Sequence, residues 1–183
     1  MTWTLDPAHS AVTFSAKHMM ITTVRGSVAI RDFSLDFDPN DIVASSVRVS
    51  LDAASIDTGQ EARDQHLRSA DFLETETHPT IDFVSTRIEP AGHDYRIHGD
   101  LTIRGVTRPV VLDAEFGGTV PNMQGGTRAA FSASTKINRD DFGLTWNVAL
   151  EQGGWLVSKD IKVEMDIAAV AEAVEATADE AAA

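Results

Sequence analysis

The chain of 183 residues contains no cysteine. This absence excludes disulfide bonds, thiolate metal sites and cysteine nucleophiles. No stretch approaches the roughly eighteen uninterrupted apolar residues of a membrane-spanning helix, so we expect no stable membrane insertion. The amino-terminal sequence MTWTLDPAHSAVTF has neither the basic nor the apolar segment of a secretion signal, which predicts a cytoplasmic protein.

Basic residues are few relative to acidic ones. The chain has 15 Lys and Arg residues against 28 Asp and Glu residues, which gives a formal net charge of −13. Phosphate backbones and anionic bilayer surfaces repel such a chain, so we expect no nucleic-acid partner. The hydrophobic content of 43% is ordinary for one globular domain with a real core.

Apolar and polar residues alternate with a period of two along most of the chain, which is typical of strands with one buried face. Between Val24 and Phe37 the apolar parity switches from even to odd. One extra residue near Arg31 and Asp32 would restore a single inward face, which predicts a β-bulge or a bend. The pattern predicts eight strands, and eight antiparallel strands form a sandwich or a closed barrel. The eight expected strands are residues 10–18, 23–37, 43–53, 80–89, 93–104, 107–118, 127–137 and 159–167.

One charged segment interrupts the strand pattern. It reads SIDTGQEARDQHLRSADFLETETHPTIDF over residues 55–83. Thr58 and Glu61 have the spacing of a capping box, which predicts a helix from about Gly59 to Ser69. Asp64 and Arg68 stand at positions i and i+4 of that helix, so we expect them to pair.

This segment has two interpretations. In the first it is a catalytic or metal-binding cluster, with His66 as base or ligand and Asp64 or Asp71 as its partner. A zinc-binding helix needs a second ligand four residues away, but positions 62 and 70 are alanine. Neither Gly-x-Ser-x-Gly nor Gly-x-x-x-x-Gly-Lys occurs in the chain. The pattern therefore favours a structural helix that plugs or buttresses a sheet, with no catalytic residue and no metal.

Five separated blocks of the sequence are distinctive: DPAHSAVTF (residues 6–14), His18, the segment from Ala54 to Thr86, GDLTIRGVTRPV (residues 99–110) and INRDDFGL (residues 137–144). Together they closely resemble the YceI-like family of polyisoprenoid-binding proteins, over roughly residues 2–167. The resemblance implies an all-β fold with one short helix, as an extended eight-stranded antiparallel lipocalin-like β-barrel. It also implies an elongated apolar cavity that takes an isoprenoid chain. The barrel domain is expected to cover residues 1–167, and the alanine- and acid-rich residues 168–183 are expected to be disordered.

A barrel of eight strands either fills its interior with side chains or holds one slim ligand. Small inward residues such as Gly26 and Gly99 are compatible with space for a ligand. His18 is open to a second interpretation, as a core histidine bonded to the backbone. Arg63 and Arg68 are candidates for contacts with a phosphate or quinone oxygen at the mouth. The predicted lining residues are Phe14, Ala16, His18, Val28, Ile30, Val47, Val49, Phe83, Leu101, Ile103, Phe131 and Trp146.

The function implied by the resemblance is non-enzymatic binding, storage or transport of a long-chain isoprenoid lipid, with no other cofactor. The lipid would be an isoprenoid quinone or a polyprenyl phosphate. Two alternatives stay open: an enzyme in which His18 or His66 is the general base, and a protein-interaction barrel with a filled core and an acidic outer face. An exposed barrel edge could also pair two copies into a homodimer.

Overall fold

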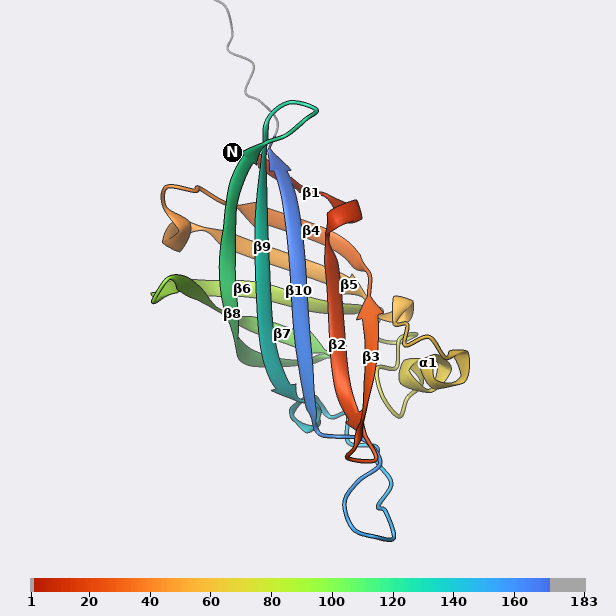
Figure 1. Cartoon of the computed structure of the whole chain (residues 1–183). Coiled ribbons are helices and arrows are strands. Elements are labelled where there is room, and N and C mark those ends of the chain that lie inside the picture. Colours follow the sequence, from red (N-terminus) through yellow and green to blue (C-terminus); the bar gives the residue numbers. More distant parts are fainter. Residues whose placement is uncertain (1, 172–183) are drawn as a thin grey trace, which may run out of the picture.

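Strands dominate the computed structural model, which describes residues 2–171 (Figure 1). The α-helix in this part of the chain is α1 (Glu61–Arg68), and short 3-10 helices cover Pro7–His9, Ile42–Ala44, Ala53–Ser55 and Arg139–Phe142. The strands are β1 (Thr2–Leu5), β2 (Ala11–His18), β3 (Thr22–Val28), β4 (Ile30–Asp36), β5 (Ser46–Asp52), β6 (Thr80–Ala91), β7 (Asp94–Ile103), β8 (Val106–Pro121), β9 (Thr127–Asn138) and β10 (Asp160–Ala171).

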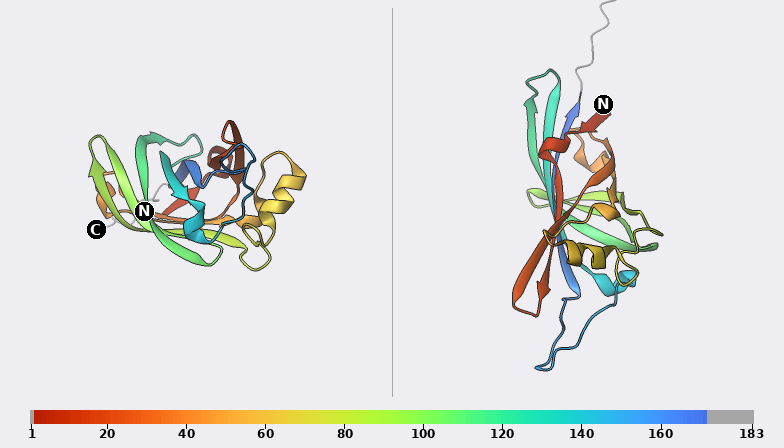
Figure 2. Two further views of the ribbon diagram at one scale, coloured as in Figure 1. Left: turned by 90° about the horizontal axis from the view of Figure 1, so that it is seen from below. Right: turned by 90° about the vertical axis from the view of Figure 1, so that its right-hand side faces the viewer.

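The strands close into an eight-stranded antiparallel barrel, as predicted. The hydrogen-bonded order runs from β1 through β4, β5, β6, β7, β8 and β9 to β10, and β10 pairs again with β1. β2 follows β1 along the same edge of β10, and β3 pairs with β2. Figure 2 shows the barrel from below and from its right-hand side. The short strand β1, which completes the closure, was not among the predicted strands.

The predicted bulge between β3 and β5 is confirmed. The ladder between β4 and β5 shifts register between Ile30 and Asp32, so Arg31 is the extra residue. The predicted strand over residues 23–37 is consequently divided into β3 and β4, with a break at Ala29. After the bulge, odd-numbered residues take over the inward side that even-numbered residues occupy before it, because one added residue reverses the parity.

The last strand extends beyond its predicted end at residue 167. β10 continues to Ala171, and its alanines there are buried beside Trp3 and Phe37. Ala171 pairs with Trp3 of β1 and with Thr127 of β9, so small side chains at this end let three strands and a large aromatic core meet. These residues therefore belong to the barrel. The rest of the segment predicted to be disordered, residues 172–183, lies outside the described residues.

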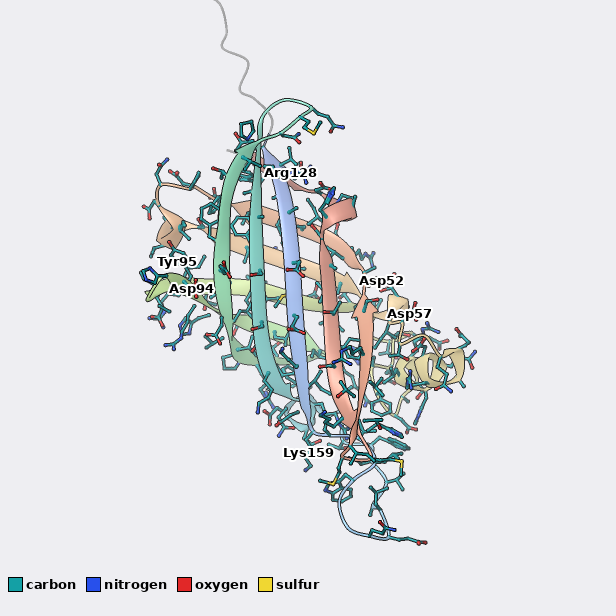
Figure 3. The ribbon with its side chains drawn as sticks, viewed as in Figure 1. Asp52, Asp57, Asp94, Tyr95, Arg128 and Lys159 are labelled. Carbon is teal, nitrogen blue, oxygen red and sulfur yellow. The ribbon has the colours of Figure 1, made fainter. Side chains whose placement is uncertain are left out.

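The charged segment fills a gap between β3 and β5. Its two ends meet where the amide of Ala53 donates to the carbonyl of Pro79 at 3.0 Å. Ser27 and Asp57 exchange two backbone hydrogen bonds of 2.9 and 3.0 Å, which attach the segment to the free edge of β3 (Figure 3). Phe72 at its far side is buried in the core. We call residues 53–79 the insert; its hydrogen bonds to β3 and its buried Phe72 attach it to the barrel, as expected of a segment that buttresses a sheet.

The first turn of α1 is held by a different contact from the predicted capping box. The N-cap Gln60 makes no side-chain capping hydrogen bond. Instead, the buried carboxylate of Asp64 accepts hydrogen bonds from the amide of Thr58, at 2.9 Å, and from its hydroxyl. Arg63 donates to the hydroxyl and the carbonyl of the same threonine. The first turn of α1 is therefore stabilised by the carboxylate of Asp64, and not by that of Glu61 as the capping box predicted.

The predicted pair of Asp64 and Arg68 is wrong. The guanidinium of Arg68 donates to the carbonyls of Ala54 and Ile56 at 2.8 and 3.0 Å, and its ion-pair partner is Glu61 at 3.3 Å. Asp64 is turned inward to Thr58 and cannot reach it. The arginine therefore ties the helix to the start of the insert.

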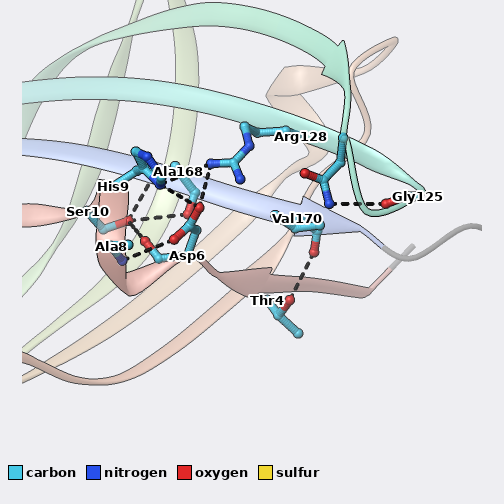
Figure 4. Close-up of polar contacts among 10 residues, drawn as sticks. Thr4, Asp6, Ala8, His9, Ser10, Gly125, Arg128, Ala168 and Val170 are labelled. Atoms are coloured by element: carbon cyan, nitrogen blue, oxygen red, sulfur yellow. Dashed lines mark hydrogen bonds and ion pairs between the residues drawn. The ribbon is translucent and has the colours of Figure 1, made fainter.

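A polar clasp joins β1 to β9 across the end of β10 (Figure 4). The carboxylate of Asp6 lies 2.8 Å from Nδ1 of His9, forms an ion pair with Arg128 and accepts a hydrogen bond from the amide of Ala8. The hydrogen bond with His9 is the largest influence that holds the pKa of Asp6 below its usual 3.8. Arg128 and the Ala8 amide act in the same direction, and desolvation opposes them.

The clasp should make part of the stability depend on pH. A carboxyl whose folded-state pKa is depressed stabilises the fold above its unfolded pKa, and this contribution disappears as the pH falls through the folded value. We therefore expect the difference in urea midpoint between wild type and Asp6→Asn to be full at pH 5 to 7. It should shrink below the unfolded pKa of about 3.8. A difference that stays constant down to the acid limit of folding would contradict this role for Asp6.

Candidate ligand-binding cavity

An elongated cavity of about 710 Å³ runs inside the barrel, and most of its lining side chains are aliphatic or aromatic. This volume is in the range of roughly 300–1,000 Å³ that is typical of small-molecule sites. The side chains of the barrel therefore do not fill its interior. This excludes the filled core that the protein-interaction alternative assumed. The shape follows from the alternating pattern, because each strand turns only every second side chain inward.

The length of the cavity can be followed along β10. Ile161, Val163, Met165 and Ile167 of this strand all border it. Six residue steps at about 3.3 Å each give a lined depth of about 20 Å. The site is therefore a narrow channel, long enough for a linear chain.

The predicted lining residues border the cavity with one exception. Ile30 does not border it, because Ile30 lies directly beside the bulge and the inward series resumes after it at Phe33 and Leu35. The sequence predicted the bulge, but the prediction that Ile30 lines the cavity is wrong. The residues that do border the cavity are Phe14, Ala16, His18, Val28, Val47, Val49, Phe83, Leu101, Ile103, Phe131 and Trp146.

The inward glycines do not leave open space, contrary to the expectation from their size. A β-carbon added at Gly26 would lie 2.5 Å from Cζ of Phe14, and one added at Gly99 would collide with the ring of Phe83. Each glycine therefore lets a phenylalanine ring lie flat along the barrel wall. The two rings form part of the apolar lining at these positions.

An aromatic cluster forms the cavity end next to β1. The rings of Phe116 and Phe131 lie 5.1 and 4.9 Å from that of Phe37, in edge-to-face geometry. Trp3 packs on Phe37 at 5.5 Å and donates its indole N–H to the carbonyl of the same residue at 2.9 Å. Such contacts hold bulky rings in fixed positions. The hydroxyl of Ser45, which also borders the cavity, is buried without a hydrogen-bond partner within residues 2–171.

The insert forms the opposite part of the cavity. The ring of His66 lies 4.5 Å from that of Trp146 and 5.0 Å from that of Phe72, both in edge-to-face geometry. Its Nε2 atom is 2.9 Å from a carboxylate oxygen of Asp71. Ala62, Arg63 and Leu67 of the same helix and its N-cap Gln60 also border the cavity. The histidine is therefore one side of an aromatic and polar end.

Arg139 is the charged residue whose importance the sequence did not reveal. Its side chain is 4% exposed and borders the cavity. The guanidinium donates to the carbonyls of Leu144, Trp146, Val157 and Ser158. In the sequence Arg139 and Asp140 are adjacent and opposite in charge, which favours a structural pair at a turn, but Asp140 pairs with Lys159 at 2.7 Å. Burial lowers the pKa of Arg139 from its ordinary value, and the charge of Asp140 offsets part of that effect.

The two arginines proposed for head-group contacts differ in position. Arg63 borders the cavity, whereas Arg68 does not, because its guanidinium is directed at carbonyls at the start of the insert. Arg63 alone remains a candidate of the two. Within residues 2–171 no group of three or more His, Asp or Glu side chains has an arrangement that could hold a metal ion. In the same part of the chain, no helix has the length and apolar character needed to cross a membrane.

Known proteins resemble this chain in sequence. The family model for the YceI-like domain matches residues 3–169. The UPF0312 protein of Staphylococcus epidermidis is 39% identical over 160 residues, which is 87% of this chain and 91% of the relative. A UPF0312 protein of Staphylococcus aureus is 37% identical over 163 residues, or 88% of this chain and 93% of the relative.

Solved structures share the barrel. The YceI protein of Campylobacter jejuni superposes with a TM-score of 0.71 at 31% identity, over 86% of this chain and 90% of that one. BcnA of Burkholderia cenocepacia gives a TM-score of 0.74 at 24% identity, over 90% and 99% of the two chains, which shows a common fold. A polyisoprenoid-binding domain from Saccharophagus degradans gives 0.64 at 15% identity, over 92% and 98%. With the family model matching nearly the whole barrel, this chain belongs to the YceI-like family.

Proposed function

We propose that the protein is a non-enzymatic carrier or store for one long-chain isoprenoid lipid, either an isoprenoid quinone or a polyprenyl phosphate. The observation that carries the proposal is the long cavity with its apolar lining. The solved neighbour from Saccharophagus degradans is described as a polyisoprenoid-binding domain, which agrees with this ligand class.

The dimensions of the cavity suit a short run of isoprene units. A residue spans about 3.3–3.6 Å over three backbone bonds, so the four chain bonds of an isoprene unit span about 4.5 Å. About four units would then occupy the lined depth of about 20 Å. A longer lipid would have to fold back inside the cavity or extend out of it.

Exchange with a bilayer is energetically feasible for such a ligand. Moving apolar carbons from water into the cavity is favourable by about 0.8 kcal/mol each. A prenyl lipid starts from a bilayer, however, and a transfer from one apolar medium to another gains little. The lipid can therefore move in both directions, as a carrier or store requires, and selectivity depends on cavity shape and polar contacts such as Arg63.

The enzyme alternative has less support. His66 has a carboxylate partner in Asp71, which is one element of a general base. Within the described residues, no hydroxyl group forms a hydrogen bond with the ring of His66, so no nucleophile is placed beside it. His18 borders the cavity without an ion pair in the same part of the chain.

The proposal is tested on protein purified from cells without added lipid. Organic extraction and mass spectrometry should find one class of isoprenoid lipid at close to one molecule per chain. Phosphorus analysis of the extract separates a polyprenyl phosphate from a quinone. A consistently empty cavity, or a mixture of unrelated lipids, would count against the proposal. Native mass spectrometry of the same sample tests whether the protein is a homodimer. The homodimer and the cytoplasmic location both stay predictions.

A further inference from the structure

An exposed apolar surface lies at one end of the barrel. It consists of Met19, Met20, Ile21, Val148 and Trp155, which we call the apolar tip. Ile21 is 82% exposed and Met20 is 63% exposed, and the other three are each about half exposed. Large apolar side chains gathered at one exposed place commonly mark an interaction site.

The tip is built from two segments that are far apart in sequence. The turn between β2 and β3 carries the first three residues, and Met19 and Met20 adopt positive φ angles of 49° and 66° there. The amide of Met19 donates to the carbonyl of Leu156 at 2.7 Å, and the amide of Leu156 donates to Val148 at 2.9 Å. These bonds join the turn and the loop before β10 into one surface, which projects beyond the barrel in Figure 1.

The tip is continuous with the lining of the cavity. His18 and Leu156, which directly adjoin Met19 and Trp155 in the chain, both border the cavity. Val157, which pairs with His18 in an isolated bridge, borders it as well. The exposed residues of the tip are therefore direct chain neighbours of residues that line the cavity.

The tip is almost free of charge. Residues 18–24 and 142–158 contain a single Asp, Glu, Lys or Arg, which is Glu151, although 23% of the whole chain is charged. A partner protein that recognised the acidic charge of the chain would find only Glu151 in these two segments. Tryptophan, methionine and isoleucine on projecting loops instead match the interfacial region of a lipid bilayer.

We propose that the apolar tip docks reversibly on a zwitterionic lipid bilayer and places the adjoining cavity against it. The lipid could then pass between bilayer and barrel without crossing water. This role of the docking rests on the proposed function. A few inserted side chains should give weak binding, on the order of the 10⁴ M⁻¹ association constant of one myristoyl chain. Anionic bilayers should bind less well, because the net charge of the chain is −13.

Flotation with phosphatidylcholine vesicles tests the docking by itself. The variant Met20→Gln/Ile21→Gln should bind at least tenfold more weakly than wild type. The matched control is Val120→Gln/Met123→Gln, which removes two exposed apolar side chains near the β8–β9 turn at the other end of the barrel. The control should bind like wild type, and binding should be insensitive to added NaCl. Wild type that fails to float, an equal loss in both variants, or binding only to anionic vesicles would each overturn the proposal.

The same variants separate this inference from the proposed function. The tip variant should unfold at the temperature of wild type and yield the same amount of lipid on extraction, because its two substituted side chains do not border the cavity. An empty wild-type protein that still floats would contradict the proposed function alone. A filled protein that does not float would contradict the docking alone.

Discussion

Replacing Val49 by aspartate is expected to lower the affinity for an isoprenoid lipid at least a hundredfold, so that the purified variant is empty. Val49 borders the cavity from β5, and it pairs with Phe33 of β4 and Phe83 of β6, which border the cavity as well. A carboxylate among these side chains has no partner, and its desolvation costs several kcal/mol. A hundredfold loss corresponds to only about 2.7 kcal/mol, so the expected effect is a conservative one.

The matched control for this experiment is Ser34→Asp. Ser34 lies next to Phe33 in β4, but it is exposed and pairs with Arg48 across the ladder. The new charge therefore stays in water beside a cation, and lipid content should equal that of wild type. Lipid content is measured by extraction and mass spectrometry, with circular dichroism to establish folding. A folded Val49→Asp protein that retains its lipid would mean that the ligand does not occupy the cavity.

Arg139→Ala is expected to reduce the free energy of unfolding by about 3–5 kcal/mol, because a hydrogen bond to a charged group contributes about 1.5–3 kcal/mol and a buried carbonyl left without a donor costs about 1–3 kcal/mol. The substitution leaves four carbonyls in the 144–158 loop without their donor. It also removes the cation that lies 5.9 Å from the ring centre of Phe72. Urea unfolding monitored by circular dichroism measures the change.

Two further substitutions sharpen this experiment. Arg139→Lys should recover only part of the stability, because an ammonium group has three donors and cannot reproduce the planar fork of a guanidinium. Arg108→Ala is the matched control, since Arg108 is exposed and the only hydrogen bond of its side chain in the described part of the chain is to the carbonyl of Thr107. The control should stay within about 0.5 kcal/mol of wild type. Equal losses at positions 108 and 139 would contradict a special role for Arg139.

The barrel was predictable from the sequence because its signal is local. Strict alternation along strands such as β5 and β10 reports which face is buried, whatever the strand pairs with. The same parity argument located the bulge at Arg31 and most of the cavity lining. The existence of an open cavity was different, since alternation is the same for a filled and for a hollow barrel, and the expectation came from family resemblance.

Features that depend on distant contacts were missed. Ala169 and Ala171 look like a loose tail in sequence, but they are buried because Trp3 and Phe37, far away in the chain, cover them. Arg139 reads as one half of a turn pair, and its carbonyl partners become visible only when the loop before β10 is placed. Gly99 was interpreted as a source of open space. The ring of Phe83 occupies that space, and this contact is not visible in the sequence because Phe83 belongs to a neighbouring strand.

The way the insert is attached has a consequence for how relatives could diversify. Its two ends meet at the bond between Ala53 and Pro79, and one isolated bridge to Ser27 is its contact with the edge of β3 in ladder geometry. Changes in the length or sequence of residues 53–79 can therefore reshape the bore of the channel while every strand keeps its register. The insert is therefore a part of the barrel wall that can set the width of the channel without a change in how the strands pair.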